Sequence, residues 1–228
     1  MASKSGPDII EDGLVLCLDA ASKRSYPGTG TTWTDLAGGV TGSFTNGASF
    51  DSNNAGSVSF DGANDKVTFT SFPQLFSGSF TFSTWVYREQ SSTRDIPFGS
   101  FSQSNNVNFE VHSANEMRFY WNNGQKDIRS TSNVSFTGWQ YLTYQRIRLS
   151  STSSTVKMYH NTTSTYNVTF SSGFSDITTP STFYAGSDAR TNSSVCLYGK
   201  IPQILIYNRA LTADEIRRNY LSTKERFA

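Results

Sequence analysis

Alternation of apolar and polar residues with a period of two is the feature that most constrains how this chain can fold. Successive side chains of a β-strand point to opposite faces, so such a run buries one face and leaves the other outward. The runs extend from near the first residue to near the last: GLVLCLDA (13–20), SVSF (57–60), DKVTFT (65–70), SFTFSTWVYRE (79–89), NVNFEVHS (106–113), EMRFYWNN (116–123), WQYLTYQRI (139–147), TVKMYHN (155–161), TFYAGS (182–187) and KIPQILIYN (200–208). Separated by turn residues, they predict two packed antiparallel sheets.

The composition suits many short strands in one domain. Of the 228 residues 36% are apolar and only 16% are charged, and the 17 Phe and 11 Tyr are typical of strands. A domain of this length buries roughly 70% of the surface of its unfolded chain, so it does not need disulfide bonds or a bound metal to be stable. We expect a β-sandwich over 13–222, an N-terminal arm at 1–12 and a C-terminal tail at 223–228.

Charge and hydropathy argue against two classes of partner. Lys and Arg number 19 against 18 acidic residues, so the chain has no large net field for nucleic acid or an anionic membrane. No run of about 18 apolar residues occurs, and the opening MASKSGPDIIEDG lacks the apolar run of a secretory signal. We expect synthesis in the cytoplasm without a signal peptide. Cys17 and Cys196 lie in apolar runs without metal spacing, which favours two buried free thiols.

The closing segment IYNRALTADEIRRNYLSTKERFA departs from the period of two and predicts a helix over 212–222. Thr212 is placed to cap this helix, and Glu215, three residues on, can return the hydrogen bond. The apolar residues of a hydrophobic staple, and of the face that packs on the sandwich, are Leu211, Ile216 and Tyr220.

Three segments resemble a known family. They are the opening GLVLCLDAASKRSYPGTGTTWTDLAG, the middle SVSFDGANDKVTF with FTFSTWVYRE, and the closing segment. Together they are similar to laminin-G-like, concanavalin A-like jelly-roll domains over nearly the whole chain. The resemblance implies an all-β fold: a two-sheet antiparallel jelly-roll β-sandwich with one short C-terminal α-helix and with its first and last strands side by side. That order would bring the strands of Cys17 and Cys196 near each other.

More narrowly, the opening and closing segments resemble the version of this domain found in virion structural proteins of tailed bacteriophages, including marine cyanophages. This resemblance implies a protein that is made in the host cytoplasm and ends in the virion. Phage particles assemble inside the cell, which agrees with the missing signal peptide.

The same superfamily contains glucanases, so catalytic carboxylates must be sought. Glycosidases need two of them about 5 to 9.5 Å apart, and the related glucanases place theirs in a Glu-x-Asp-x-x-Glu pattern on one strand. Here Glu110 is followed two positions later by His112, and Glu116 lies beyond a turn. We therefore expect no enzyme, with Glu110 a solvent-facing strand residue. His112 and His160 lie in different strands without triad partners or clustered zinc ligands.

A calcium site is one alternative left open. Many such sandwiches hold calcium at the sheet rim, and the resemblance implies Asp61, Asn64 and Asp65 of the DGAND turn as oxygen ligands. Asp188 would approach from another loop. The other interpretation is that these residues are simply good turn formers.

A sugar platform is the second alternative. Tyr120 and Trp121 are adjacent, so they point to opposite faces of a strand and one of them is expected to face outward, where its ring can lie against a sugar. Trp33, Trp85 and Trp139 fall at positions where the family has a recurring Trp, which implies packing.

Two functions from different classes follow. The first is a non-enzymatic virion structural protein of a tailed phage, either capsid decoration or a tail or fibre component, which contacts other virion proteins as a homo-oligomer or symmetric assembly. The arm at 1–12 and the segment after Ser222 are expected to lie against neighbours. The alternative is a lectin-like adhesion module that binds a host surface glycan, with or without calcium. The two are compatible, since a virion fibre can bind sugars.

Overall fold

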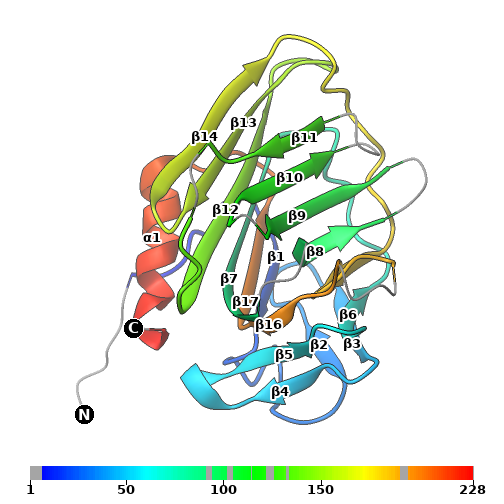
Figure 1. Cartoon of the computed structure of the whole chain (residues 1–228), viewed down its shortest axis with the longest axis vertical. Helices are drawn as coiled ribbons and strands as arrows, with labels where there is room; N and C mark the ends of the chain where they lie inside the picture. The colour runs from blue at the N-terminus through cyan, green and yellow to red at the C-terminus, as the bar shows by residue number, and fades with distance from the viewer. Residues whose placement is uncertain are drawn as a thin grey trace.

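β-Strands form both layers of the structure, as the period-two runs predict. The computed structural model describes residues 7–90, 94–101, 105–113, 115–121, 126–131, 134–190 and 195–227. Within these residues the chain forms two packed antiparallel sheets, with α1 (Ala213–Thr223) outside them (Figure 1). The predicted fold class, an all-β two-sheet sandwich with one short C-terminal helix, is confirmed.

The strands divide into a nine-stranded and an eight-stranded sheet over the described ranges. The nine-stranded sheet consists of β1 (Leu14–Asp19), β4 (Ser49–Asp51), β5 (Ser57–Asp61), β7 (Phe80–Gln90), β12 (Trp139–Arg148), β13 (Ser154–His160), β14 (Thr163–Phe170), β16 (Tyr198–Ile201) and β17 (Gln203–Tyr207). The eight-stranded sheet consists of β2 (Thr32–Thr34), β3 (Thr41–Thr45), β6 (Lys66–Phe69), β8 (Arg94–Ser100), β9 (Val107–His112), β10 (Met117–Trp121), β11 (Lys126–Arg129) and β15 (Phe183–Ala185). The described residues also include the short 3-10 helices η1 (Asn53–Ala55) and η3 (Lys224–Arg226).

Strand β7 is the centre of the nine-stranded sheet. On one side it pairs with β12, with Tyr87 opposite Trp139. On the other side it pairs with β17 and then with β16. Pro202 separates those two strands because it has no N–H for the ladder. The first strand, β1, pairs with the last, β17, with Leu16 opposite Ile206, as the resemblance implied.

The core lies between the sheets and is rich in stacked phenylalanines. On β7 the inward side chains include Phe82, whose ring stacks on Phe109 of β9 with a centroid distance of 4.3 Å and on Phe98 of β8 at 5.4 Å. All three are almost fully buried. Burying one such side chain is worth about 1.5–3 kcal/mol, so this cluster holds the two sheets together.

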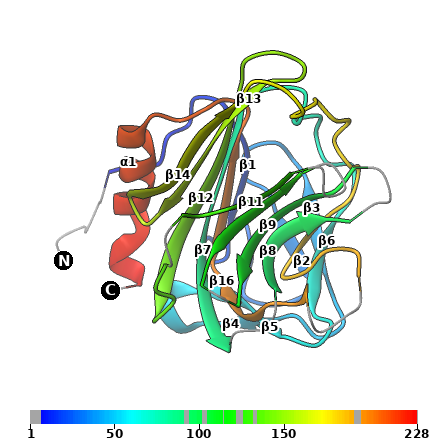
Figure 2. The same ribbon diagram turned by 45° about the horizontal axis from the view of Figure 1, so that its top comes forward.

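A second apolar layer lies on the outer side of the nine-stranded sheet, where α1 covers it (Figure 2). Trp85 of β7 stacks there on Tyr220 of α1 with a centroid distance of 5.3 Å, and its indole N–H donates to Thr223 Oγ1 at 2.8 Å. Ile216 is buried in the same layer. Strand β7 is therefore buried on both faces, and α1 functions as the cover of the outer one.

The helix begins as its sequence predicts. The Thr212 side chain accepts a hydrogen bond from the Glu215 backbone N–H at 3.2 Å, and Glu215 Oε2 accepts one from the Thr212 N–H at 2.8 Å, so the capping box is confirmed. Leu211 is buried beside Ile216 in the outer layer. In the described part of the chain no helix is long and apolar enough to cross a membrane.

Both ends of the described chain pack on its own sandwich. In the arm, the Ile10 N–H donates to Asn219 Oδ1 of α1 at 2.8 Å, and the Tyr207 hydroxyl donates to the Ile10 carbonyl at 2.9 Å. In the tail, the Phe227 ring lies 4.7 Å from the Trp85 ring. Residues 1–6 of the arm and residue 228 of the tail lie outside the described residues. Contacts of either end with neighbouring molecules stay a prediction.

Both cysteines are buried free thiols, as their apolar surroundings predict. Cys17 lies on β1 in the outer layer, where burial raises the pKa of its thiol to about 12. Burial also raises the pKa of Cys196, whose Sγ is 3.4 Å from the Ser187 hydroxyl. Both side chains therefore stay protonated at neutral pH.

The first testable prediction concerns the helix cap. Replacing Thr212 with alanine leaves the Glu215 N–H without its acceptor, and loss of such a cap costs about 1 kcal/mol of unfolding free energy. Urea denaturation measures the change. Thr162→Ala, at an exposed position in the β13–β14 turn, is the matched control and should leave stability unchanged. Equal stability of the Thr212 variant and wild type would show that the cap contributes nothing.

The second testable prediction concerns how the stability of the fold depends on pH. The hydrogen bond from Arg209 lowers the pKa of Glu215 to about 2, from an ordinary value of 4.5. Because the folded-state pKa is depressed, this stabilisation is present above pH 4.5 and is lost as the pH falls toward 2. Glu215→Gln keeps an acceptor for the cap but removes the ion pair. We expect it to be less stable than wild type by about 0.5 kcal/mol at neutral pH, with the difference vanishing at acid pH.

Thermal unfolding over a pH series measures this effect. Glu225→Gln is the matched control, because the Glu225 side chain is 66% exposed and lies 3.9 Å from Lys224. A difference between the Glu215 variant and wild type that does not change with pH would exclude the ion pair as its cause.

Candidate functional site

The structure separates the two members of the predicted sugar platform. Trp121 of β10 has no exposed surface; its ring lies in the core 5.1 Å from Phe174, and its indole N–H donates to the Ser175 carbonyl at 3.0 Å. Trp121 therefore cannot present its ring to a ligand, and this part of the prediction is wrong. Tyr120 points outward, flanked by the guanidinium groups of Arg94 and Arg118 at 5.6 Å and 4.9 Å from its centroid.

The expectation that Glu110 faces solvent is also wrong. Glu110 points to the outer face of the eight-stranded sheet, but its exposed fraction is 0%, so it is not solvent-facing. Arg94 Nε on the neighbouring strand β8 donates to Glu110 Oε2 at 3.0 Å, and Arg118 Nη1 on β10 donates to the same oxygen at 3.0 Å. The arginines of both flanking strands cover the carboxylate. Such a paired carboxylate is a structural ion pair and not a free general acid or base.

The predicted calcium ligands lie in two separate hydrogen-bonded groups. In the β5–β6 turn, Asp65 is 4% exposed, burial raises its pKa, and its Oδ2 accepts the Asp61 N–H at 3.0 Å. Asn64 is exposed and its carbonyl accepts from an asparagine side chain at 3.0 Å. Asp188 is fully buried and accepts a hydrogen bond from Arg190 Nε at 3.0 Å, so the guanidinium balances its negative charge.

One atom of this set favours a cation. Asp65 Oδ1 is buried without a hydrogen-bond partner among the residues the structure describes. Against that, no group of three His, Cys, Asp or Glu side chains gathers in the described part of the molecule. Calcium binding at Asp65 therefore stays a prediction.

The two histidines lie on different sheets. His112 of β9 has its pKa lowered by burial and is 3.3 Å from the Ser113 hydroxyl. Burial also lowers the pKa of His160 of β13, whose Nε2 is 2.6 Å from Gln140 Oε1. Each histidine thus has a local polar partner of its own.

The three other tryptophans differ in how far they are buried. Trp33 is fully buried in the core, and Trp85 lies beneath α1. Trp139 is only half-buried. One side of its ring is braced by Phe227 at a centroid distance of 4.8 Å. The part that remains uncovered lines a pocket at the edge of the layer under α1.

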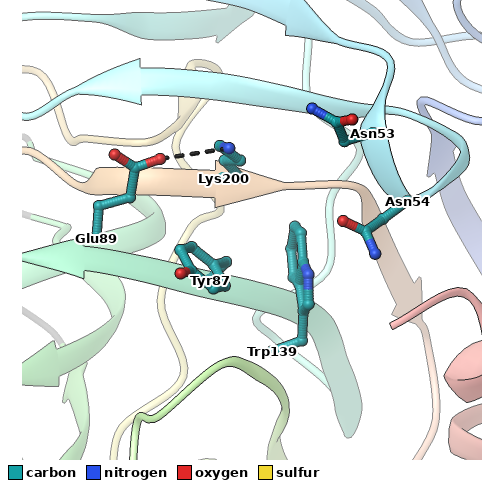
Figure 3. A pocket seen from close by; sticks show the side chains of 6 residues that line it. All are labelled: Asn53, Asn54, Tyr87, Glu89, Trp139 and Lys200. Atoms are coloured by element: carbon teal, nitrogen blue, oxygen red, sulfur yellow. Dashed lines mark ion pairs between the residues drawn. The ribbon is translucent and has the colours of Figure 1, made fainter. Parts of the chain in front are cut away.

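This pocket, which we call the β7 pocket, has a volume of about 670 Å³ and lies on the outer side of the nine-stranded sheet (Figure 3). Four elements contribute to it: η1, β7, β12 and β16. Its lining side chains are Asn53, Asn54, Tyr87, Glu89, Trp139 and Lys200.

Strand register explains why these residues meet. Tyr87 and Glu89 are two apart on β7, so they share a face. Trp139 on β12 is opposite Tyr87 on one side, and Lys200 on β16 is opposite Tyr87 on the other. The Tyr87 ring therefore lies between an aromatic wall and a charged wall, and its centroid is 5.3 Å from that of Trp139.

The third wall comes from η1. Asn54 has φ +53°, in the left-handed region that asparagine tolerates better than most residues. Its Nδ2 donates to the Arg226 carbonyl at 3.0 Å, which ties η1 to the C-terminal segment. Asn53 Nδ2 donates to Asp51 Oδ1 at 2.7 Å. Both carboxamides are thus held at the pocket by their neighbours.

The charged wall is an ion-pair network around one lysine. Lys200 Nζ lies 2.8 Å from Asp51 Oδ2 and 3.4 Å from Glu89 Oε1. The hydrogen bond between Lys200 and Asp51 raises the pKa of the lysine and lowers the pKa of the aspartate, so both groups stay charged at neutral pH. The pocket therefore combines two aromatic rings with fixed polar and charged groups.

Sequence reasoning did not identify this pocket. Tyr87 and Glu89 carry a signal in the sequence, an aromatic and a charged residue on the outward face of a strand, whereas the family position of Trp139 implies packing. Lys200 and the η1 asparagines come from distant segments. The register of β16 on β7 brings Lys200 there, and the pairing of β4 and β5 beside β16 brings η1.

Comparison with known families places most of the chain in one of them. Residues 61–217 match the family Laminin_G_3, described as the Concanavalin A-like lectin/glucanases superfamily. No curated protein matches the sequence.

Several solved structures share the fold. A Trypanosoma rangeli sialidase in complex with 2,3-difluoro-KDN has a TM-score of 0.66 and 14% identity, covering 99% of this chain and 37% of the sialidase. Domain 4 of AbnA, a GH43 extracellular arabinanase from Geobacillus stearothermophilus in complex with arabinotriose, has a TM-score of 0.68 and 15% identity, covering 92% of this chain and 100% of the domain.

The botulinum neurotoxin serotype D binding domain has a TM-score of 0.69 and 15% identity, covering 92% of this chain and 52% of that domain's chain. This protein spans about a third of the length of the sialidase chains it resembles, 37% in the sialidase above. At these identities the likeness shows the fold alone.

The third testable prediction concerns Glu110. Glu110→Gln removes the buried negative charge that Arg94 and Arg118 share, and breaking such a buried pair costs about 3 kcal/mol of unfolding free energy. Glu116→Gln is the matched control, since Glu116 is partly exposed and pairs with Arg129 at 3.2 Å. Urea denaturation compares the two. A hydrolytic activity on β-glucan that Glu110→Gln removes without loss of stability would instead place Glu110 in catalysis.

Proposed function

The chain belongs to the Concanavalin A-like lectin/glucanases superfamily, and from that premise we propose that it is a non-enzymatic glycan-binding module whose site is the β7 pocket. The observation that carries the proposal is the pair of rings, Tyr87 and Trp139, set 5.3 Å apart in a cavity with amide and charged side chains around it. Sugars have apolar C–H faces and hydroxyl rims. A ring lies against the former, and fixed polar groups hydrogen-bond the latter.

The rigidity of the pocket supports this function. Phe227 braces Trp139, and the Asn54 carboxamide is held by the Arg226 carbonyl. Side chains that are already ordered lose little conformational entropy when a ligand binds. The floor is Tyr87 on the central strand, which is less mobile than a loop.

Structures that share the fold add support of a coarser kind. Domain 4 of AbnA was solved in complex with arabinotriose, and entry of botulinum neurotoxin type C into cells depends on interaction with two ganglioside molecules. These are properties of those proteins. They support a glycan as the ligand class here because the superfamily fold is shared.

A virion structural role is the narrower proposal and rests on the resemblance of the opening and closing segments to tailed-phage proteins. A glycan-binding pocket is compatible with it, since a capsid or fibre protein that binds a host surface glycan would serve both roles. Contacts with other virion proteins and a symmetric assembly belong to this proposal.

The fourth testable prediction separates two candidate surfaces. Trp139→Ala removes one ring of the β7 pocket, and Tyr120→Ala removes the outward ring of the eight-stranded sheet. Retention is measured by affinity electrophoresis in dextran, arabinan and methyl-esterified pectin. We expect Trp139→Ala to weaken binding about tenfold or more, because a buried aromatic contact contributes on the order of 1.5–3 kcal/mol. Tyr120→Ala should bind like wild type.

The outcomes of this experiment discriminate. If only Tyr120→Ala loses retention in the gels, the glycan site lies on the eight-stranded sheet instead. If wild type is not retained in any gel, the glycan-binding function is rejected. Thermal unfolding of each variant checks that the fold is intact. Running each gel with calcium chloride and with EDTA tests the ion expected at Asp65.

A further inference from the structure

We infer that the β7 pocket selects uncharged glycans and discriminates against those that carry carboxylate or sulfate groups. This inference rests on the proposed function and specifies the ligand class of the same site. It follows from the charges that line the pocket and from the hydrogen-bonding groups that remain for a ligand.

The lysine in the pocket is already compensated. Lys200 Nζ is shared by Asp51 at 2.8 Å and Glu89 at 3.4 Å, so one positive charge faces two negative ones and the local net charge is −1. A ligand carboxylate that approached the third N–H of the ammonium would lie close to both carboxylates, and like charges at such distances repel.

The nearby arginines do not give the pocket a positive charge that an acidic ligand could bind. Arg226 Nη1 pairs with Asp19 Oδ2 at 2.9 Å, and its remaining guanidinium nitrogens are buried away from solvent. Arg88, the next residue along β7 from Tyr87, points to the opposite face and pairs with Asp95 inside the sandwich. Neither guanidinium is available to a ligand in the β7 pocket.

The polar groups that remain favour hydroxyl donors. Asn53 Nδ2 donates to Asp51 Oδ1, and Asn54 Nδ2 donates to the Arg226 carbonyl. One of the two N–H groups of each carboxamide is thus taken by a protein acceptor, and the two amide oxygens and the Glu89 carboxylate can only accept hydrogen bonds. A neutral sugar offers O–H donors to these groups, whereas carboxylates and sulfates have only acceptors to offer.

The test compares matched polymers that differ in charge. The probes are methyl-esterified pectin against polygalacturonic acid, and dextran against dextran sulfate, each by affinity electrophoresis at low and at high salt. We expect wild type to bind at least one neutral member, and to bind its acidic counterpart at least tenfold more weakly. The difference should shrink at high salt, because the pocket charges are partly exposed.

Glu89→Gln tests the cause. It raises the local net charge from −1 to 0, so we expect the ratio of neutral to acidic binding to fall severalfold, whatever the change in affinity for the neutral polymer itself. Glu116→Gln makes the same chemical change on the other sheet and should keep the wild-type ratio. An unchanged ratio in Glu89→Gln would overturn the electrostatic explanation and with it the inference.

The remaining outcomes separate this inference from the proposed function. Tighter wild-type binding to the acidic members, lost in Trp139→Ala, would overturn the inference and leave the glycan-binding function in place. Absence of binding to every member of both pairs would overturn the proposed function and the inference together.

Discussion

Burial of β7 on both faces is the constraint on which the rest of the structure depends. Its inward side chains, such as Phe82, pack against the phenylalanines of the opposite sheet, and its outward Trp85 lies beneath α1. A strand with two apolar faces cannot stay at a surface, so the fold must supply a cover on each side. The second sheet is one cover and the terminal helix is the other. Figure 2 shows the two on opposite sides of the nine-stranded sheet.

The candidate site lies where this second cover ends. Helix α1 and the residues after it cover the outer sheet as far as Phe227, which contacts both Trp85 and Trp139. Beyond that ring, Tyr87 and Trp139 remain partly open, and polar residues of η1 and β16 surround them. Apolar surface left open at the edge of a covered sheet is a natural place for a ligand that has both apolar and polar faces.

The period of two could be read from the sequence, and so could the direction in which each strand side chain points. That is why the fold class, the β1 to β17 pairing implied by the resemblance, and the capping box of Thr212 and Glu215 agree with the structure. Exposure was harder to predict. Glu110 points outward as expected but is covered by arginines from β8 and β10, because strand neighbours distant in sequence decide what lies over a residue. The β7 pocket was missed for the same reason: Lys200 reaches Tyr87 only through strand register.

The brace that Phe227 places against Trp139 links the site to the last turn of the chain. The segment that follows α1 is held on the sandwich by the ring contacts of Phe227, by the ion pair between Arg226 and Asp19, and by the hydrogen bond from Asn54. Whenever it opens, the indole loses its support, and the platform for a sugar ring is lost before the sandwich itself is disturbed. Ligand binding and docking of this segment are therefore thermodynamically coupled: a ligand held against Trp139 stabilises the docked segment, and any interaction that detaches the segment lowers the affinity of the pocket.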